Sequence, residues 1–249
     1  MANHDNSKLQ EMQPLWGILG GMGPLASSEF LSTVYRLSLG PSEQATEQCM
    51  PRIILVSDPT IPDRTKAIKE RSTNPEQYQE VIDALQRRLE DLLKLNADRM
   101  AIACVTAHHF LEDFPKHLKS RLTSLLDLVI EKLSSGSGKY ILLRTNGALH
   151  TEIFEHHPRW SKVSSRVVSL NPGDQQALHD NHLYQIKMRG AQAGDLKFLE
   201  GLRQKYQVDG FIAGCTEVHL LTKGLQQLEI PVIDPLYILA ERIAKPVCR

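Results

Sequence analysis

Short apolar runs that end in small or polar residues recur along the chain. They indicate buried strands of a parallel sheet, because helices cover both faces of such a sheet. The run R-I-I-L-V-S, for example, leads into a loop with Pro59 and Pro62, whose rings are incompatible with regular structure. We expect strands at 15–20, 52–57, 140–144 and 166–170, and near residues 100, 125, 211 and 232.

Between these runs, apolar residues recur at every third or fourth position, as in helices that bury one face. The clearest helix begins at Asn74 and Pro75 and carries one apolar stripe from Tyr78 to Leu93. Strand, helix and strand then follow in an order that gives parallel pairs through right-handed crossovers. We expect further helices at 25–39, 177–188 and 196–206, and a closing helix after 234.

Part of this pattern occurs twice. Asp98 to Leu111 (D-R-M-A-I-A-C-V-T-A-H-H-F-L) resembles Asp209 to Leu221 (D-G-F-I-A-G-C-T-E-V-H-L-L). The two copies match Cys104 with Cys215 and His108 with His219. The repeat extends to two later segments, L-L-D at 125–127 and V-I-D at 232–234.

The duplication predicts an α/β fold of two similar lobes related by a pseudo-twofold axis. Each lobe is a parallel four-stranded sheet flanked by helices. Strands near 16, 53, 100 and 232 would form one sheet and those near 125, 140, 167 and 211 the other, so the last strand crosses back to the first lobe. The N-terminal lobe is then 1–121 plus 229–249, with 1–14 as a polar tail, and the C-terminal lobe is 122–228. Ligands bind at the carboxyl ends of parallel strands, so we expect one site in the cleft between the lobes.

Charge and composition limit the classes of partner that the protein is expected to bind. The 249 residues include 29 basic and 29 acidic side chains, a balance that disfavours nucleic acid or a membrane surface as partner. No apolar run approaches the length of a membrane span, and the polar first 14 residues lack the core of a signal peptide. Four cysteines without a C-x-x-C pair favour a reducing compartment. We expect a cytoplasmic protein that binds a small molecule.

Four interpretations of Cys104 and Cys215 compete. Each could be a small buried hydrophobe, and with His108 and His219 they could form a Cys₂His₂ zinc site, although structural zinc ligands usually lie closer in sequence. One could be a nucleophile, which leaves the second thiol unexplained. Two thiols facing each other across a cleft could instead act as the two bases of a racemase, because one removes the Cα proton and the other returns a proton to the opposite face. A thiol at a helix N-terminus has a lowered pKa, so a working thiolate fraction is expected near neutral pH.

Seven motifs then resemble the aspartate/glutamate racemase family, and together they cover most of the chain. They are G-G-M-G-P (20–24), I-P-D-R-T (61–65), C-V-T-A-H (104–108), L-L-R-T-N-G-A (142–148), I-K-M-R-G (186–190), G-C-T-E (214–217) and V-I-D-P (232–235). The resemblance implies two α/β lobes, no cofactor, and Cys104 and Cys215 as the acid/base pair. Such proteins are often dimers, so it also implies a homodimer.

The same resemblance implies roles for further residues. Arg64, which follows the second strand on a stiff loop, and Lys187 approach the carboxylates of the substrate. Neutral donors come from three threonines and from the glycine turn, which lets a ligand approach backbone N–H groups or else only requires a positive φ. The threonines are Thr106, Thr145 and Thr216, and the turn contains Gly21 and Met22. Glu217, His108 and His219 support the site, the histidines as helix-face residues near it rather than as bases.

The chain departs from the family pattern after Cys104 and after Leu143. Val105 stands where the family usually has Asn, and Arg144 and Ala148 stand where it has Ala and Thr. Lost polar contacts would weaken substrate binding if both positions faced the ligand. The leading hypothesis is a racemase of aspartate and/or glutamate. The alternatives are the same thiol pair acting on another amino acid or a small dicarboxylate, and a ligand-binding protein that has lost turnover.

Overall fold

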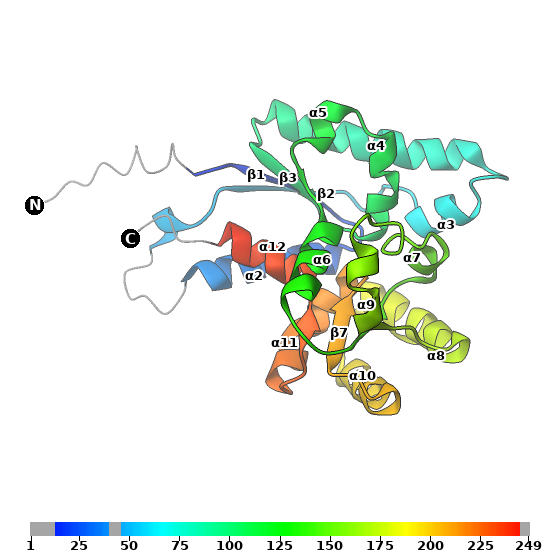
Figure 1. Cartoon of the computed structure of the whole chain (residues 1–249). Helices are drawn as coiled ribbons and strands as arrows, with labels where there is room; N and C mark the ends of the chain where they lie inside the picture. The colour runs from blue at the N-terminus through cyan, green and yellow to red at the C-terminus, as the bar shows by residue number, and fades with distance from the viewer. Residues whose placement is uncertain (1–12, 40–45, 245–249) are drawn as a thin grey trace, which may run out of the picture.

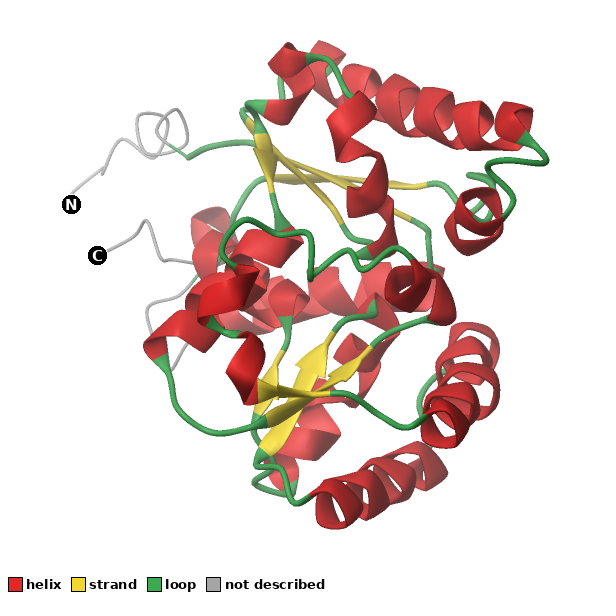
Figure 2. Ribbon diagram, turned by 45° about the vertical axis from the view of Figure 1, so that its right-hand side comes forward, coloured by secondary structure: helices red, strands yellow, loops and turns green. Residues whose placement is uncertain are grey.

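Two parallel four-stranded sheets of the same topology form the centre of the molecule (Figures 1 and 2). The computed structural model describes residues 13–39 and 46–244. The first sheet has the order β2-β1-β3-β4 and the second the order β6-β5-β7-β8. Their strands are β1 (Trp16–Gly20), β2 (Ile53–Ser57), β3 (Arg99–Ile102), β4 (Leu122–Thr123), β5 (Tyr140–Leu143), β6 (Val167–Val168), β7 (Gly210–Ala213) and β8 (Val232–Ile233). The two-lobe α/β fold is therefore confirmed.

Helices connect the strands and cover both faces of each sheet (Figure 2). The α-helices are α2 (Pro24–Leu39), α3 (Arg64–Lys69), α4 (Pro75–Lys94), α5 (Lys116–Lys119), α6 (Leu125–Ser135), α7 (Asn146–His150), α8 (Pro172–Ala177), α9 (Tyr184–Arg189), α10 (Ala193–Tyr206), α11 (His219–Gln227) and α12 (Pro235–Ile243). Short 3₁₀ segments are η1 (Glu47–Cys49), η2 (Thr106–Asp113), η3 (Trp160–Lys162), η4 (Ser164–Arg166) and η6 (Thr216–Val218), and the π-helical η5 (Leu178–Leu183) joins α8 to α9. Among these, α4 confirms the clearest expectation, since Asn74 caps its first turn by accepting from the N–H of Gln77.

The strands separate three apolar clusters. Alternate residues point to opposite faces, so Leu19 and Met100 pack under α4, whereas Ile18 and Ala101 pack against α2. In the second sheet, Ile141 and Phe211 pack against the outer helices. The middle cluster joins the lobes through α2, α6 and α12, which lie between the two sheets in Figures 1 and 2. These helices therefore pack between the two sheets.

Two strands belong to the opposite sheet from the one expected. β4 pairs with β3 in the first sheet, and β8 pairs with β7 in the second. The expected strand near 125 is also displaced, because Leu125 begins α6 and the strand ends at Thr123. Leu125 is buried by the packing of the first turn of α6, so its apolar character does not mark a strand.

The chain thus crosses between lobes after these strands rather than before them. β4 is followed by Ser124, which caps α6, and β8 is followed by Asp234, which caps α12. From there α6 packs under the second sheet and α12 packs against α2 of the first lobe. The expected crossings at residues 122 and 229 were wrong in their strand assignment, because the helices and not the strands make the exchange.

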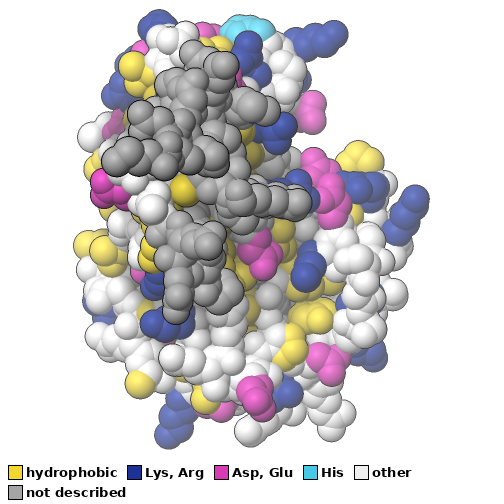
Figure 3. Space-filling view, turned by 90° about the vertical axis from the view of Figure 1, so that its left-hand side faces the viewer, with side chains coloured by type: hydrophobic (Ala, Val, Ile, Leu, Met, Phe, Trp, Pro, Cys, Tyr) yellow, Lys and Arg dark blue, Asp and Glu magenta, His cyan; other side chains and the backbone are white. Residues whose placement is uncertain are grey.

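Basic and acidic side chains are interspersed on the face shown in Figure 3. Within residues 13–39 and 46–244, no helix combines the length and apolar composition that a membrane crossing requires.

Candidate functional site

The two matched cysteines occupy equivalent places in the two lobes. Cys104 follows β3 and leads into η2, and Cys215 follows β7 and leads into η6. Both side chains are buried. Each thiol therefore stands at the carboxyl end of a central parallel strand, the edge at which α/β sheets bind ligands.

Both thiols line a single small cavity between the lobes. Its other walls come from the glycine turn, the start of α3, the segment after β5 and helix α9. The space inside holds about 10 Å³ for the centre of a water molecule, which is room for about one water. The lining residues are Met22, Asp63, Arg64, Thr65, Cys104, Val105, Thr106, Thr145, Lys187, Cys215, Thr216 and Glu217.

Most residues selected from the sequence meet in this cavity. Of those expected near the substrate, only Gly21, His108 and His219 lie outside its lining. Asp63 and Thr65 line the cavity and were missed, although they flank Arg64 within the motif I-P-D-R-T. Asp63 caps α3 by accepting from the N–H of Lys66. In the sequence, an Asp that caps a helix does not stand out as a residue of a binding site.

Arg64 presents an unused donor to the cavity. We expected Arg64 in a loop, but it is the first residue of α3. Its Nη1 donates to the carbonyls of Ile61 and Pro62, and its Nη2 lies 3.4 Å from the carbonyl of Met22. The buried Nε has no hydrogen-bond partner. A guanidinium fixed by its far side, with Nε–H free, can receive a carboxylate side-on.

Lys187 provides the second cation. Its Nζ lies 4.0 Å from Oε1 of Glu217 and 4.9 Å from the centre of the Tyr184 ring. Burial alone would lower the pKa of Lys187, but the negative charges of Glu217, Cys215 and Cys104 outweigh it and raise that pKa. Lys187 is therefore a permanent cation that both thiol groups influence.

Glu217 is a buried carboxylate beside one thiol only. Its Oε2 accepts a hydrogen bond from Sγ of Cys215 at 2.7 Å, and its Oε1 has no hydrogen-bond partner. Burial and the charge of Glu217 raise the pKa of the Cys215 thiol well above its usual value. The expectation that a helix N-terminus lowers this pKa was wrong for Cys215, because burial and a neighbouring anion dominate over it.

The glycine turn has a structural cause of its own. Gly21 has φ of +92°, and a Cβ at this position would lie 2.3 Å from the amide nitrogen of Asp58. Its N–H donates to Oγ of Ser27 at 2.9 Å. The backbone therefore requires glycine at this position for its conformation and for close packing, without reference to a ligand.

The two matched histidines anchor the segments that carry the thiols. His108 bonds the carbonyl of Cys104 through Nδ1, and its Nε2 accepts from the N–H of Leu125. His219 bonds Oδ2 of Asp234 through Nδ1 at 2.5 Å, and Thr33 through Nε2. Each ring thus connects a thiol loop to the helix start of the crossing segment that follows it.

These contacts use both ring nitrogens of each histidine, so neither ring is free to join the thiols around zinc. In the described part of the chain, no group of three or more Cys, His, Asp or Glu side chains is arranged to hold a metal ion.

Only one of the departures from the family pattern faces the cavity. Val105 lines it as a branched hydrocarbon. Arg144 is turned away and forms an ion pair with Glu155, and Ala148 is fully buried in the middle apolar cluster. Of the three departures, Val105 is therefore the one placed to contact a ligand in this cavity.

Comparisons with known proteins identify the family of the chain and support its fold. The sequence profile of the Asp/Glu/hydantoin racemase family matches residues 19–243. The broad specificity amino-acid racemase RacX of Bacillus subtilis (strain 168) is 22% identical over 90% of this chain and 94% of its own. The structure of Picrophilus torridus aspartate racemase is 24% identical with a TM-score of 0.74 and covers 93% of this chain and 94% of its own. The Klebsiella pneumoniae allantoin racemase is 13% identical, with a TM-score of 0.57 and coverage of 93% and 86%.

Proposed function

The chain belongs to the Asp/Glu/hydantoin racemase family and is an isomerase of the racemase type, and from this premise we propose that it racemises aspartate and/or glutamate without a cofactor. Cys104 and Cys215 are the two acid/base residues of this proposal. One observation carries it: two thiols from matching strand ends line the same cavity as the cations Arg64 and Lys187.

The two-thiol step leaves the enzyme ready for the reverse reaction. A thiolate on one face takes the proton from Cα, so the C–H bond breaks and an S–H bond forms. The thiol on the other face then gives its proton to Cα and becomes the thiolate. The raised pKa of Cys215 favours its protonated form, so we assign Cys215 the proton-donating role in the first direction. The thiol states exchange with each turnover.

Fixed charges around the cavity stabilise the carbanion that develops at Cα. Arg64 receives a carboxylate of the substrate on its unused Nε, and Lys187 meets the second carboxylate. The substrate ammonium group then finds an acceptor in Oε1 of Glu217, which accepts no hydrogen bond and lies 4.0 Å from Nζ of Lys187. Thr106, Thr145 and Thr216 supply neutral hydroxyl groups on the remaining walls. Two cations in one cavity favour a dicarboxylic amino acid.

Substrate entry requires the lobes to separate. Space for about one water is far too small for an amino acid, so the described state is closed. Closing after binding excludes water and strengthens the interactions of the site with the developing charge.

The direct test is exchange of the Cα proton with solvent. The reduced full-length protein, incubated in deuterated water with L- or D-aspartate or glutamate, should place deuterium at Cα and yield both enantiomers. Mass spectrometry and chiral chromatography measure the two events separately. A folded and reduced protein that exchanges none of the four compounds would exclude acidic amino acids as substrates.

Single thiol variants test the mechanism. Cys104→Ala and Cys215→Ala should each abolish racemisation, because one face then lacks its acid/base group. The remaining thiol should still exchange the proton of the enantiomer whose Cα–H it faces. Retention of racemisation by either variant at the wild-type rate would refute the two-base assignment.

Val105 favours a second candidate, the same chemistry on another amino acid or a small dicarboxylate. Its hydrocarbon side chain removes a polar contact from the cavity wall, and the similar RacX protein is named for broad amino-acid specificity. Exchange across a panel of neutral and acidic amino acids distinguishes the two candidates. Activity limited to aspartate and glutamate would exclude the second, and Val105→Asn should shift activity toward them. Stabilisation by ligands without exchange of any of them would indicate a binding protein that has lost turnover.

The same proposal predicts that the protein is a homodimer, that it is cytoplasmic and that its partner is a small-molecule amino acid.

A further inference from the structure

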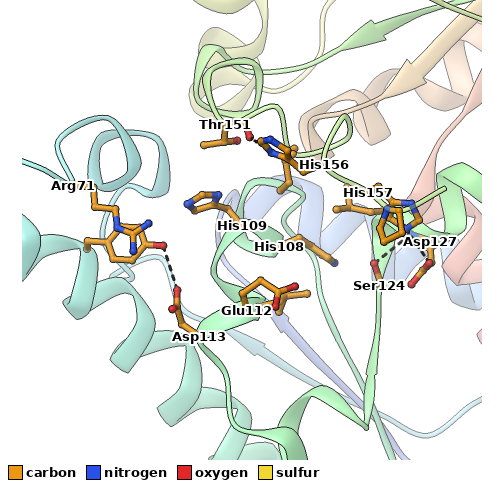
Figure 4. Close-up of a pocket in the computed structure, with 15 residues that line it drawn as sticks. Arg71, His108, His109, Glu112, Asp113, Ser124, Asp127, Thr151, His156 and His157 are labelled. Atoms are coloured by element: carbon orange, nitrogen blue, oxygen red, sulfur yellow. Dashed lines mark hydrogen bonds and ion pairs between the residues drawn. The ribbon is translucent and has the colours of Figure 1, made fainter. Parts of the chain in front are cut away.

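A second cavity, much larger than the one between the thiols, lies at the junction of the two lobes (Figure 4). Its volume is about 560 Å³, within the range of small-molecule sites. One wall comes from the α3–α4 region and η2, and the other from the start of α6 and the segment after α7. Its charged and imidazole side chains are Arg71, His108, His109, Glu112, Asp113, Asp127, His156 and His157.

Three of these side chains have no polar partner. Arg71 lies over the ring of Tyr78 at 4.3 Å, and His109 meets the same ring edge-on, but neither forms a hydrogen bond or ion pair from its side chain with any residue in 13–39 or 46–244. The carboxylate of Glu112 likewise has no donor within those ranges. The other acids are engaged, since Asp113 accepts from Tyr78 and Asp127 from Arg159.

The unpaired groups lie in an arrangement that suits a zwitterion. His109 and Glu112 are three residues apart on the 3₁₀ segment η2, so their side chains lie on one face about 6 Å apart along its axis. In Figure 4, Arg71, His109 and His156 follow one another across the view, and Glu112 lies below them. Burial and the nearby positive charges of Arg71 and His156 lower the pKa of His109, and the charge of Asp113 offsets only part of this effect.

We infer that this cavity is a second binding site for a small amino acid, whose carboxylate pairs with Arg71 and His109 and whose ammonium group pairs with Glu112. A dicarboxylate without an amine would meet the charge of Glu112 unfavourably, and an amine without a carboxylate would meet Arg71. The occupant therefore carries both groups.

Occupancy of this site bears on the thiol site through His108. The ring of His108 lines the large cavity and also bonds the carbonyl of Cys104 and the N–H of Leu125. A ligand beside it touches the segment that holds one thiol and the start of helix α6, which crosses to the second lobe.

Calorimetric titration of the full-length Arg64→Ala variant separates the two sites, because that variant lacks the carboxylate donor of the thiol cavity. L-alanine is the probe, and succinate and propylamine each lack one of its two charged groups. We expect L-alanine to bind and each analogue to bind at least tenfold more weakly. Adding Arg71→Ala should weaken L-alanine at least tenfold, whereas adding Arg87→Ala, on the exposed face of α4, should change nothing.

Absence of L-alanine binding, or equal binding after Arg71→Ala, would overturn the inference. The imidazole ¹⁵N signals of His109 in the wild-type protein give an independent measurement that does not depend on the Arg64 variant. They should shift with L-alanine in the wild type and remain unchanged in Arg71→Ala. Because both readouts record binding rather than turnover, they stand apart from the outcome of the exchange test for racemase activity.

Discussion

The carboxylate of Glu217 accepts a hydrogen bond from the thiol of Cys215 over 2.7 Å. The matching position after Cys104, two residues on, holds Thr106, which cannot carry a negative charge. The two lobes repeat the same sheet and the same thiol, but they differ in this neighbour. The pseudo-twofold symmetry of the site is therefore broken in its electrostatics. Under the proposed two-base mechanism, that difference favours Cys215 as the proton donor.

Glu217→Gln tests this asymmetry directly. The amide keeps an acceptor for the thiol but removes the negative charge, so the pKa of Cys215 should fall. Thiolate absorbance at 240 nm, titrated in a Cys104→Ala background, measures the change. Turnover of the single variant should fall about tenfold or more, because Cys215 is then held less strongly in the protonated form that the proposal requires. Thr106→Val removes no charge and should leave the Cys215 titration in place; an unshifted titration in Glu217→Gln would contradict the assignment.

Arg64→Lys should weaken substrate binding while preserving charge. The ammonium group cannot reproduce the free Nε–H or the bonds that fix the guanidinium to Ile61 and Pro62. We expect KM to rise at least tenfold, equivalent to about 1.4 kcal/mol or more, with a smaller change in kcat. Steady-state kinetics measure both values. The exposed Arg87→Lys is the matched control, and an unchanged KM in Arg64→Lys would remove Arg64 from the carboxylate site.

Gly147→Ala should force the lobes apart beside the thiol cavity. A Cβ on Gly147 would lie 2.5 Å from Oγ1 of Thr65, which lines that cavity from the opposite lobe. Overpacking of this kind costs about 1–3 kcal/mol, and the displaced wall should raise KM as well. Denaturant unfolding and kinetics give the two effects. Gly201→Ala, in α10 with open space around it, should instead stabilise the protein by about 0.5–1 kcal/mol.

Apolar patterning located the strands well but misplaced the second part of the repeat. Leu125, Leu126 and Asp127 imitate Val232, Ile233 and Asp234 in composition, yet the structural equivalents of the latter are Leu122, Thr123 and Ser124. A search for apolar runs does not detect Thr123 and Ser124, because both side chains are polar. Because the sequence does not encode sheet partners locally, the assignment of β4 and β8 depended on that false match.

For the site, too, the sequence predicted some features and missed others. Motif spacing brought ten residues of the thiol cavity together correctly, because strand ends and helix starts position them. It could not show that Arg64 Nε and Glu217 Oε1 lack partners, or that Ala148 faces the core rather than the ligand. Those facts depend on side-chain direction across the lobe junction. The prediction of a lowered pKa for Cys215 was wrong for a similar reason, because burial and the carboxylate two residues away outweigh the effect of the helix N-terminus.

His108 should make the protein sensitive to acid. Burial lowers its pKa from 6.5 to about 4, and the bond to the Cys104 carbonyl offsets only part of that effect. Between pH 4 and pH 6.5 the unfolded chain binds a proton at His108 more readily than the folded chain does. The contribution of the neutral ring to the free energy of unfolding is therefore fully present above pH 6.5 and is lost as the pH falls toward 4. The loss amounts to about 2–3 kcal/mol by pH 4.5. Urea unfolding of wild type and His108→Gln at pH 7.5 and 4.5 measures it: the variant should be less stable at pH 7.5, and the gap between the two proteins should narrow at pH 4.5. A gap that stays constant with pH would show that the ring does not carry this linkage.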